Sequence, residues 1–186
     1  MNGGPDGVPD DGIGVRRLDA ADALGAVPAL ARLLVDCVEG GASVSFMLPI
    51  TVEKAHAFWR TIADGVARGD RVLLVAENAE ERIVGTVQLL LALPENQPHR
   101  ADVAKMLVSP SARRRGIAEQ LLHAVEVEAV REGRTLLVLD TVTGSSADRL
   151  YTRNGWQRVG EIPDYALMPN GERCPTTIFY KALTQG

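Results

Sequence analysis

Residues 108–122, VSPSARRRGIAEQLL, join a predicted strand to a predicted helix and place three arginines and a glycine at the junction. The first N–H groups of a helix have no intrahelical partner, and the helix dipole adds a partial positive charge there. Gly116 removes a side chain that would hold an anion away from those amides, and the small Ala118 allows a close approach. The stretch predicts a site for an anionic group, although a solvated, charged helix cap has the same pattern.

Helix and strand alternate around this junction. A strand at 101–108 precedes it, and the predicted helix at 115–131 has an apolar inner face. That face consists of Ile117, Leu121, Leu122, Val125 and Ala129. Residues 135–140 (TLLVLD) are almost continuously apolar, as expected of a strand covered on both faces, and a short helix at 145–154 follows. The order strand, helix, strand, helix predicts an α/β fold with a mixed sheet.

The rest of the chain supplies further strands and two more helices. Asp22 is expected to cap a helix that ends near residue 38, with an inner face of Leu24, Val27, Leu30, Leu34 and Val38. The other predicted elements are strands at 15–19, 71–77, 82–93, 157–162 and 176–182, a helix at 51–68 and a loop at 163–175. About seven strands and four helices result, in one domain at 15–186. Residues 1–14, MNGGPDGVPDDGIG, are expected to be a disordered tail because they contain few large apolar groups.

Composition and charge exclude several classes of function. The chain is 46% hydrophobic and 24% charged, as is typical of a globular protein, and its net charge of −4 does not attract nucleic acid or an anionic membrane. No apolar stretch reaches the ~20 residues that a membrane span needs. Cys37 and Cys174 have neither a C-x-x-C spacing nor a neighbouring histidine pair. We therefore expect reduced packing cysteines, no metal site and a cytoplasmic protein.

Two motifs resemble those of the GNAT superfamily of N-acetyltransferases. Arg113-x-x-Gly116-x-Ala118, preceded by Val108-x-Pro110, is similar to the Q/R-x-x-G-x-G/A acetyl-CoA motif of the superfamily. A second block, Ala147-x-x-Leu150-Tyr151-x-x-x-Gly155-Trp156, resembles its A-x-x-L-Y-x-x-x-G-F signature. The resemblance covers nearly all of residues 15–183. It implies the GNAT fold, in which the central parallel strands splay apart, and acetyl-CoA as the co-substrate.

The resemblance also implies which residues bind the coenzyme. The pantetheine arm would pair with the backbone of the fourth strand, at Met106, Leu107 and Val108. The pyrophosphate would bind where the following helix opens, in the segment Arg113, Arg114, Arg115, Gly116, Ile117 and Ala118. An asparagine that is common in the family seven residues before the tyrosine is replaced by Gly144, so we expect Ser145 or Ser146 to make its contact.

Three side chains are candidates for proton transfer. Tyr151 stands where the family has a tyrosine that donates a proton to the departing coenzyme A thiolate, with a packing role as the alternative. The acceptor amine must lose a proton before it attacks a thioester. Asp102 occupies the position of a catalytic glutamate in histone acetyltransferases, and it is predicted to be a general base, an anchor for the substrate ammonium or a strand-edge carboxylate. Asp140 ends an apolar strand, so it either binds the amine, shares the base role or caps the next loop.

The acceptor is expected to be the amine of a small molecule. A finer resemblance, to the tabtoxin resistance acetyltransferases, implies a resistance function and lies in residues 40–44 (GGASV), 139–141 (LDT) and 159–165 (VGEIPDY). Residues 40–46 are expected to form a loop over the acceptor site, with a plain connection between helices as the alternative. Acetylation of a protein N-terminus or lysine and a non-catalytic coenzyme-binding sensor are the competing functions. A homodimer is also considered, because dimers are frequent among such relatives.

Overall fold

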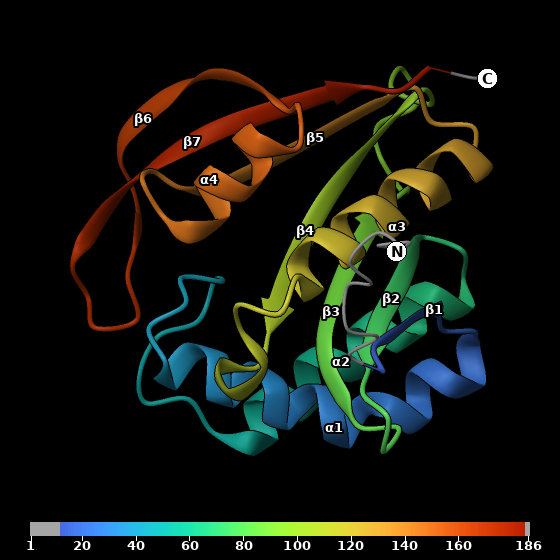
Figure 1. Cartoon of the computed structure of the whole chain (residues 1–186), viewed down its shortest axis with the longest axis vertical. Coiled ribbons are helices and arrows are strands. Elements are labelled where there is room, and N and C mark those ends of the chain that lie inside the picture. The colour runs from blue at the N-terminus through green and yellow to red at the C-terminus, as the bar shows by residue number, and fades with distance from the viewer. Residues whose placement is uncertain (1–11, 185–186) are drawn as a thin grey trace, which may run out of the picture.

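A computed structural model describes residues 12–184, which form a seven-stranded sheet with helices on both faces (Figure 1). The strand order is β1-β2-β3-β4-β5-β7-β6, with β4 and β5 as the parallel pair. The strands are β1 (Gly14–Arg17), β2 (Arg71–Glu77), β3 (Ile83–Leu90), β4 (Arg100–Val108), β5 (Leu136–Val142), β6 (Gln157–Leu167) and β7 (Arg173–Ala182). The helices are α1 (Ala20–Glu39), α2 (Val52–Ala67), α3 (Ile117–Arg131) and α4 (Ser146–Arg153), with a 3₁₀ turn at Pro110–Ala112. The predicted α/β class with a mixed sheet is confirmed.

The sheet separates two apolar cores. Helices α1 and α2 pack on one face and α3 packs on the other. Side chains of β2 alternate between them, since Val72 and Leu74 belong to the α3 core whereas Leu73 and Val75 belong to the α1–α2 core. A slip of one residue would exchange the two faces, so burial on both sides fixes the register of this strand.

Strands β4 and β5 pair over a short stretch and then diverge. Residues 100–102 of β4 pair with residues 136–138 of β5. Beyond this point β4 continues along β3 to Val108, whereas β5 continues along β7 to Val142. Figure 1 shows the two strands separating toward α4 and the loop that follows α1. The predicted splaying of the central parallel strands is confirmed.

A β-bulge interrupts β4 in its divergent half. Between two consecutive residue pairs that join β3 to β4, the β4 segment is one residue longer than the β3 segment. Lys105 lies in this longer segment and has a φ of 53°. Strict alternation would place Val103 and Leu107 on the same face of the sheet. Instead Val103 packs in the α3 core and Leu107 packs in the α1–α2 core. The bulge therefore inverts the direction of the side chains that follow it.

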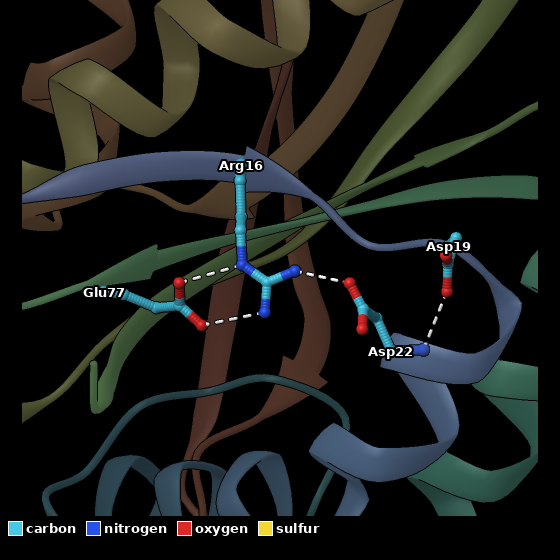
Figure 2. A network of polar contacts seen from close by, with 4 residues as sticks. All are labelled: Arg16, Asp19, Asp22 and Glu77. Carbon is cyan, nitrogen blue, oxygen red and sulfur yellow. Dashed lines mark hydrogen bonds and ion pairs between the residues drawn. The ribbon is translucent and has the colours of Figure 1, made fainter.

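Arg16 joins three elements at the β1 edge of the sheet (Figure 2). Its Nε and Nη2 donate to the two carboxylate oxygens of Glu77 at 2.8 and 3.1 Å, and its Nη1 donates to Asp22 at 2.5 Å. The side chain of Asp19 accepts a hydrogen bond from the backbone N–H of Asp22 and caps α1. These contacts connect β1, β2 and α1, and each exposed ion pair stabilises the fold by at most about 1 kcal/mol.

Two predictions about α1 are wrong. Asp22 was expected to be the N-cap, but the helix begins at Ala20 and its N-cap is Asp19. The Asp19 carboxylate accepts a hydrogen bond from the backbone N–H of Asp22. Leu24 was expected on the inner face but is 56% exposed. The buried stripe runs through Ala23 and Val27, and Leu24 lies at its edge, about 100° from Ala23 around the helix. The other four residues expected on that face are buried.

The C-terminal hairpin is longer than predicted. Strands β6 and β7 extend into the region 163–175, so the predicted loop is reduced to a turn at 168–172. Pro163 is tolerated within β6 because this is the edge strand and its pairing is irregular between Ile162 and Ala166. The hairpin projects beside α4 on the far side of the diverging strands (Figure 1).

Three other expectations concern the tail, the cysteines and membrane association. The predicted tail at 1–14 falls mainly on residues 1–11, which lie outside the described residues, and β1 begins at Gly14. Cys37 and Cys174 are buried and free, as predicted. No helix within residues 12–184 has the length and apolar character needed to cross a bilayer.

Gly85 of β3 should be intolerant of larger side chains, because α3 lies directly on it. A Cβ atom there would be 2.9 Å from Leu121 Cδ1 and 3.2 Å from the carbonyl oxygen of Leu107. We expect Gly85→Val to lower the free energy of unfolding by about 1–3 kcal/mol, measured by urea denaturation. Gly160→Val is the matched control, since a Cβ at Gly160 in β6 meets nothing within 4 Å. Equal stability of the two variants would contradict the close packing of α3.

Candidate active site

A cavity of about 740 Å³ lies between the diverging strands β4 and β5. Its walls are the divergent half of β4, the turn before α3, the end of β5 with α4, and the loop after α1. The β6–β7 hairpin completes it with Tyr165, Ala166 and Met168. Pockets for small ligands span roughly 300–1,000 Å³, so this cavity has the size of a ligand site.

The turn before α3 forms one end of the cavity, which we call the anion end (residues 113–118). Arg114 has a φ of 67° and Gly116 a φ of 75°, so left-handed residues bring successive amides of the turn toward one side. Gly116 is the N-cap of α3 and has no side-chain cap, and a Cβ atom on it would meet nothing within 4 Å. The first amides of α3 therefore open onto free space, which suits an anion.

The predicted coenzyme residues of this turn lie mainly on the cavity wall. Arg113, Arg114, Gly116, Ile117 and Ala118 line the cavity, whereas Arg115 does not. Arg113 and Arg114 bring positive charge to the anion end, in addition to the helix dipole.

The open edge of β4 forms a second wall. Met106, Leu107 and Val108 all line the cavity. On one side Leu107 and Val108 pair with β3, but the pairing with β5 ends at Asp102, so the other edge of the strand faces the cavity. An extended polar ligand can take the place of the missing strand there.

Of the two candidate serines, Ser146 is the one whose hydroxyl makes no hydrogen bond within residues 12–184. The hydroxyl of Ser145 accepts from the N–H of Asp148 at 3.1 Å and caps α4. Ser146 is the first residue of α4 and lines the cavity. The local geometry thus favours Ser146 as the residue that contacts a ligand.

Tyr151 of α4 is held rigidly in the cavity wall. It is 4% exposed, and its ring lies 5.7 Å from that of Trp156 and 5.8 Å from that of Phe179. Burial raises the pKa of Tyr151, and the negative charge of Asp140 raises it further. The phenol is therefore protonated at neutral pH and is a hydrogen-bond donor.

The structure brings Asp140 and Tyr151 together but places Asp102 elsewhere. Asp140, near the end of β5, lines the cavity, and within residues 12–184 its carboxylate makes no hydrogen bond or ion pair. Asp102 is ion-paired with Arg100 on the stretch where β4 still pairs with β5, and it does not line the cavity. Of the two aspartates, Asp140 is thus the one that can reach a ligand in the cavity.

Lys105 is a cavity residue that the sequence analysis did not identify. Its Nζ donates to Ser45 Oγ at 2.8 Å, and Ser45 belongs to the loop after α1, which also lines the cavity. The signal available in the sequence was a single lysine within the otherwise apolar segment VAKMLV. Of residues 40–46, which were expected to form a loop over the acceptor site, Gly40 to Ser45 form part of the cavity wall.

Comparisons with known proteins agree with this architecture. A family model described as Acetyltransferase (GNAT) domain matches residues 69–158, which is just under half of the chain. An uncharacterized N-acetyltransferase encoded in the hisH-hisA intergenic region of Azospirillum brasilense is 31% identical over 107 residues. That match covers 56% of this chain, and the chain spans 61% of the relative's length.

Solved structures share the fold over almost the whole chain. The putative acetyltransferase yncA from Salmonella typhimurium, solved with its cofactor acetyl-CoA, has a TM-score of 0.75 and 17% identity, with 94% of this chain and 96% of that one covered. The ribosomal-protein-alanine N-acetyltransferase from Brucella melitensis has a TM-score of 0.74 and 23% identity, with coverage of 91% and 99%. The chain therefore has the GNAT fold, as the motifs implied.

Tyr151→Phe should make the stability of the protein less sensitive to alkaline pH. In the unfolded chain the phenol ionises near pH ~10, whereas its pKa is raised in the folded protein. A raised folded-state pKa gives stability that is complete below pH ~10 and is lost as the pH rises further. Urea unfolding should show that wild type loses about 1.4 kcal/mol per pH unit above pH ~10 relative to the variant. Parallel stability curves from neutral pH to pH ~11.5 would contradict the buried environment of Tyr151.

Proposed function

Since the chain has the GNAT fold and residues 69–158 match the GNAT acetyltransferase domain, we propose that the protein transfers an acetyl group from acetyl-CoA to the amine of a small molecule. One observation carries the proposal. A single cavity joins the amides that open α3 to the unpaired carboxylate of Asp140 and the buried phenol of Tyr151. An anionic coenzyme and an amine can therefore meet within it.

The coenzyme fits the residues at the anion end. The pyrophosphate would accept hydrogen bonds from the amides of residues 114–118, with Arg113 and Arg114 balancing its charge. The pantetheine arm would run along the open edge of β4 at Met106 to Val108, and Ser146 would contact it from α4. This placement brings the thioester into the cavity that Asp140 and Tyr151 also line.

The two side chains then divide the proton transfers. Asp140 accepts a proton from the bound ammonium, which frees the nitrogen lone pair for attack on the thioester carbonyl. Attack forms the new C–N bond and gives a tetrahedral intermediate, whose nitrogen releases its second proton to solvent. Collapse of this intermediate then breaks the C–S bond. The thiolate that leaves takes a hydrogen bond and then a proton from the Tyr151 phenol, which solvent protonates again. No acyl-enzyme is required, because the amine attacks the thioester directly.

The enclosure of the cavity favours a small acceptor over a peptide. Two hydrogen bonds tie the loop after α1 to the β6–β7 hairpin: Ser43 Oγ donates to the Leu167 carbonyl at 3.1 Å, and the Leu48 N–H donates to the Pro169 carbonyl at 3.0 Å. A peptide acceptor needs an open groove, whereas this bridge joins two of the segments that line the cavity. Neighbours of the same fold include enzymes named for ribosomal-protein acceptors, so acetylation of a protein N-terminus is the alternative.

The finer resemblance to the tabtoxin resistance acetyltransferases adds a proposal about biological role. A toxic amino compound is the acceptor that this resemblance implies, and a resistance enzyme of the cytoplasm is the corresponding function. Acetylation of such a compound by the purified protein, with loss of its toxicity, is the test.

Gly116→Asp should abolish binding of acetyl-CoA. The new carboxylate would lie among the amides proposed to hold the pyrophosphate and would repel it, with an expected loss of affinity of at least about 10²-fold in titration calorimetry. Gly133→Asp is the matched control, because Gly133 follows the other end of α3 with a similar φ of 70° and equally open space around its Cβ position. Unchanged affinity in the Gly116 variant would remove the proposed coenzyme site.

Asp140→Asn should reduce turnover by about 10²- to 10⁴-fold, which is the usual contribution of a general base, without changing the affinity for acetyl-CoA. Asp102→Asn provides the comparison, since Asp102 is paired with Arg100 outside the cavity, and we expect it to stay within about tenfold of wild type. Thiol release from acetyl-CoA with a panel of amines measures both. The opposite ranking of the two variants would assign the base role to Asp102.

A further inference from the structure

Lys105 is half-buried in the cavity wall on the side away from α3. Its ammonium donates to Ser45 Oγ at 2.8 Å and lies 5.8 Å from the centroid of the Phe58 ring of α2. Partial burial lowers the pKa of Lys105. Both contacts come from the α1–α2 side of the sheet, whereas the anion end is built by the turn that opens α3 on the other side. Lys105 therefore contacts the side of the sheet away from the turn proposed to hold the coenzyme phosphates, which leaves it available to an acceptor.

The charge of Lys105 has no counter-ion in direct contact. Within residues 12–184 no carboxylate lies at ion-pair distance from its Nζ. Asp140 attracts it through space, from the opposite wall of the cavity. A partly desolvated ammonium without a paired anion is costly, so this arrangement suits a lysine whose partner arrives with a ligand.

The backbone holds this lysine and its serine partner in unusual conformations. Lys105 has a φ of 53° and Ser45 a φ of 74°, both in the left-handed region. Non-glycine residues in that region are uncommon, and such conformations cost about 1–3 kcal/mol and gather at ligand sites. The hydrogen bond from Lys105 to Ser45 thus joins two strained positions, each of which directs its side chain to the same part of the cavity.

We propose that the acceptor carries an anionic group, in the first instance a carboxylate, close to the amine that is acetylated. Lys105 and the hydroxyl of Ser45 bind the carboxylate, while Asp140 binds the ammonium and removes its proton. An α-amino acid, whose ammonium and carboxylate are attached to one carbon, matches the two opposite charges that face each other across the cavity. The proposal rests on the proposed acetyltransferase function and narrows its substrate class.

The same geometry disfavours a peptide acceptor. The N-terminal residue of a peptide has its α-carboxyl group in an amide bond, so it cannot neutralise Lys105. A simple alkylamine also leaves this ammonium unpaired. A site that is built to pair with a charged group rejects an analogue without it by a large factor, because its own polar groups then remain unsatisfied.

The test compares matched acceptors. The full chain and acetyl-CoA are incubated with four sets of acceptors: the common α-amino acids, longer-chain acids such as β-alanine, the corresponding carboxamides and the decarboxylated amines. The acetylated products are measured by mass spectrometry. For the best free acid we expect kcat/KM to exceed that of its carboxamide by at least about 10²-fold. Equal or faster reaction of carboxamides or decarboxylated amines would overturn the proposal, and so would the absence of any reactive free acid.

Two lysine variants sharpen the comparison. Lys105→Met should lower kcat/KM for the free acid by about 10²-fold and change that for the carboxamide by less than about threefold, so the preference for the acid disappears. Lys54→Met is the matched control, because Lys54 Nζ also lies 5.8 Å from an aromatic centroid, that of Phe46, but Lys54 is exposed and does not line the cavity. We expect Lys54→Met to keep the wild-type preference. Equal losses for acid and carboxamide in the Lys105 variant would also overturn the proposal.

The coenzyme measurement separates this proposal from the proposed function. If acetyl-CoA binds and amines without an anionic group are acetylated as fast as free acids, the protein is an acetyltransferase and the proposed carboxylate site is wrong. If acetyl-CoA does not bind in titration calorimetry, the acetyltransferase function itself is wrong. Should Lys105→Met fail to fold, the acid-to-carboxamide ratio of the wild-type chain still decides the question.

Discussion

The separation of β4 from β5 after Asp102 is the constraint on which the rest of the site depends. Two adjacent parallel strands normally satisfy each other's backbone groups, and a buried strand edge without partners is costly. Here the backbone groups of β5 are satisfied along one edge by its full pairing with β7. The divergent half of β4 pairs only with β3, so its other edge has no partner strand. The cavity exists because the sheet changes partners at this point, and its open edge is a place where a ligand's polar groups replace a strand.

Charge divides the cavity into two regions with different chemistry. The anion end combines helix amides with Arg113 and Arg114, although the carboxylate of Glu119 also lines the cavity in the first turn of α3. On the other side a cation and an anion, Lys105 and Asp140, face the same space without forming an ion pair. Tyr151 stands in the wall that Asp140 shares, held by Trp156 and Phe179. Such an arrangement has the charges that the proposed pair of ligands requires, one strongly anionic and the other of mixed charge, and a protonated donor shares the wall with the carboxylate.

Sequence patterns within single elements predicted much of this structure. Features that depend on contacts between distant segments were not predicted. The helix at α3, its buried face and the glycine that opens it follow from spacing within about fifteen residues, and all five residues predicted for that face are buried. By contrast, whether Asp102 lies inside or outside the cavity depends on where the pairing of β4 with β5 ends. The sequence of β4 alone does not predict that point. The length of the β6–β7 hairpin was underestimated because Pro163 normally ends a strand, and only its place on the sheet edge makes it acceptable.

The bulge in β4 explains why Lys105 in particular could not be placed from its sequence. With strict alternation Lys105 would share a face with Val103 and lie in the α3 core, where an ammonium has no partner. The extra residue inverts the alternation, so that Leu107 packs in the α1–α2 core and Lys105 reaches Ser45 and Phe58 instead. A lysine that looked like a misplaced charge in an apolar strand thus becomes a polar group facing the cavity. The same irregularity that removes ladder hydrogen bonds and introduces backbone strain brings a cation to the cavity wall opposite Asp140.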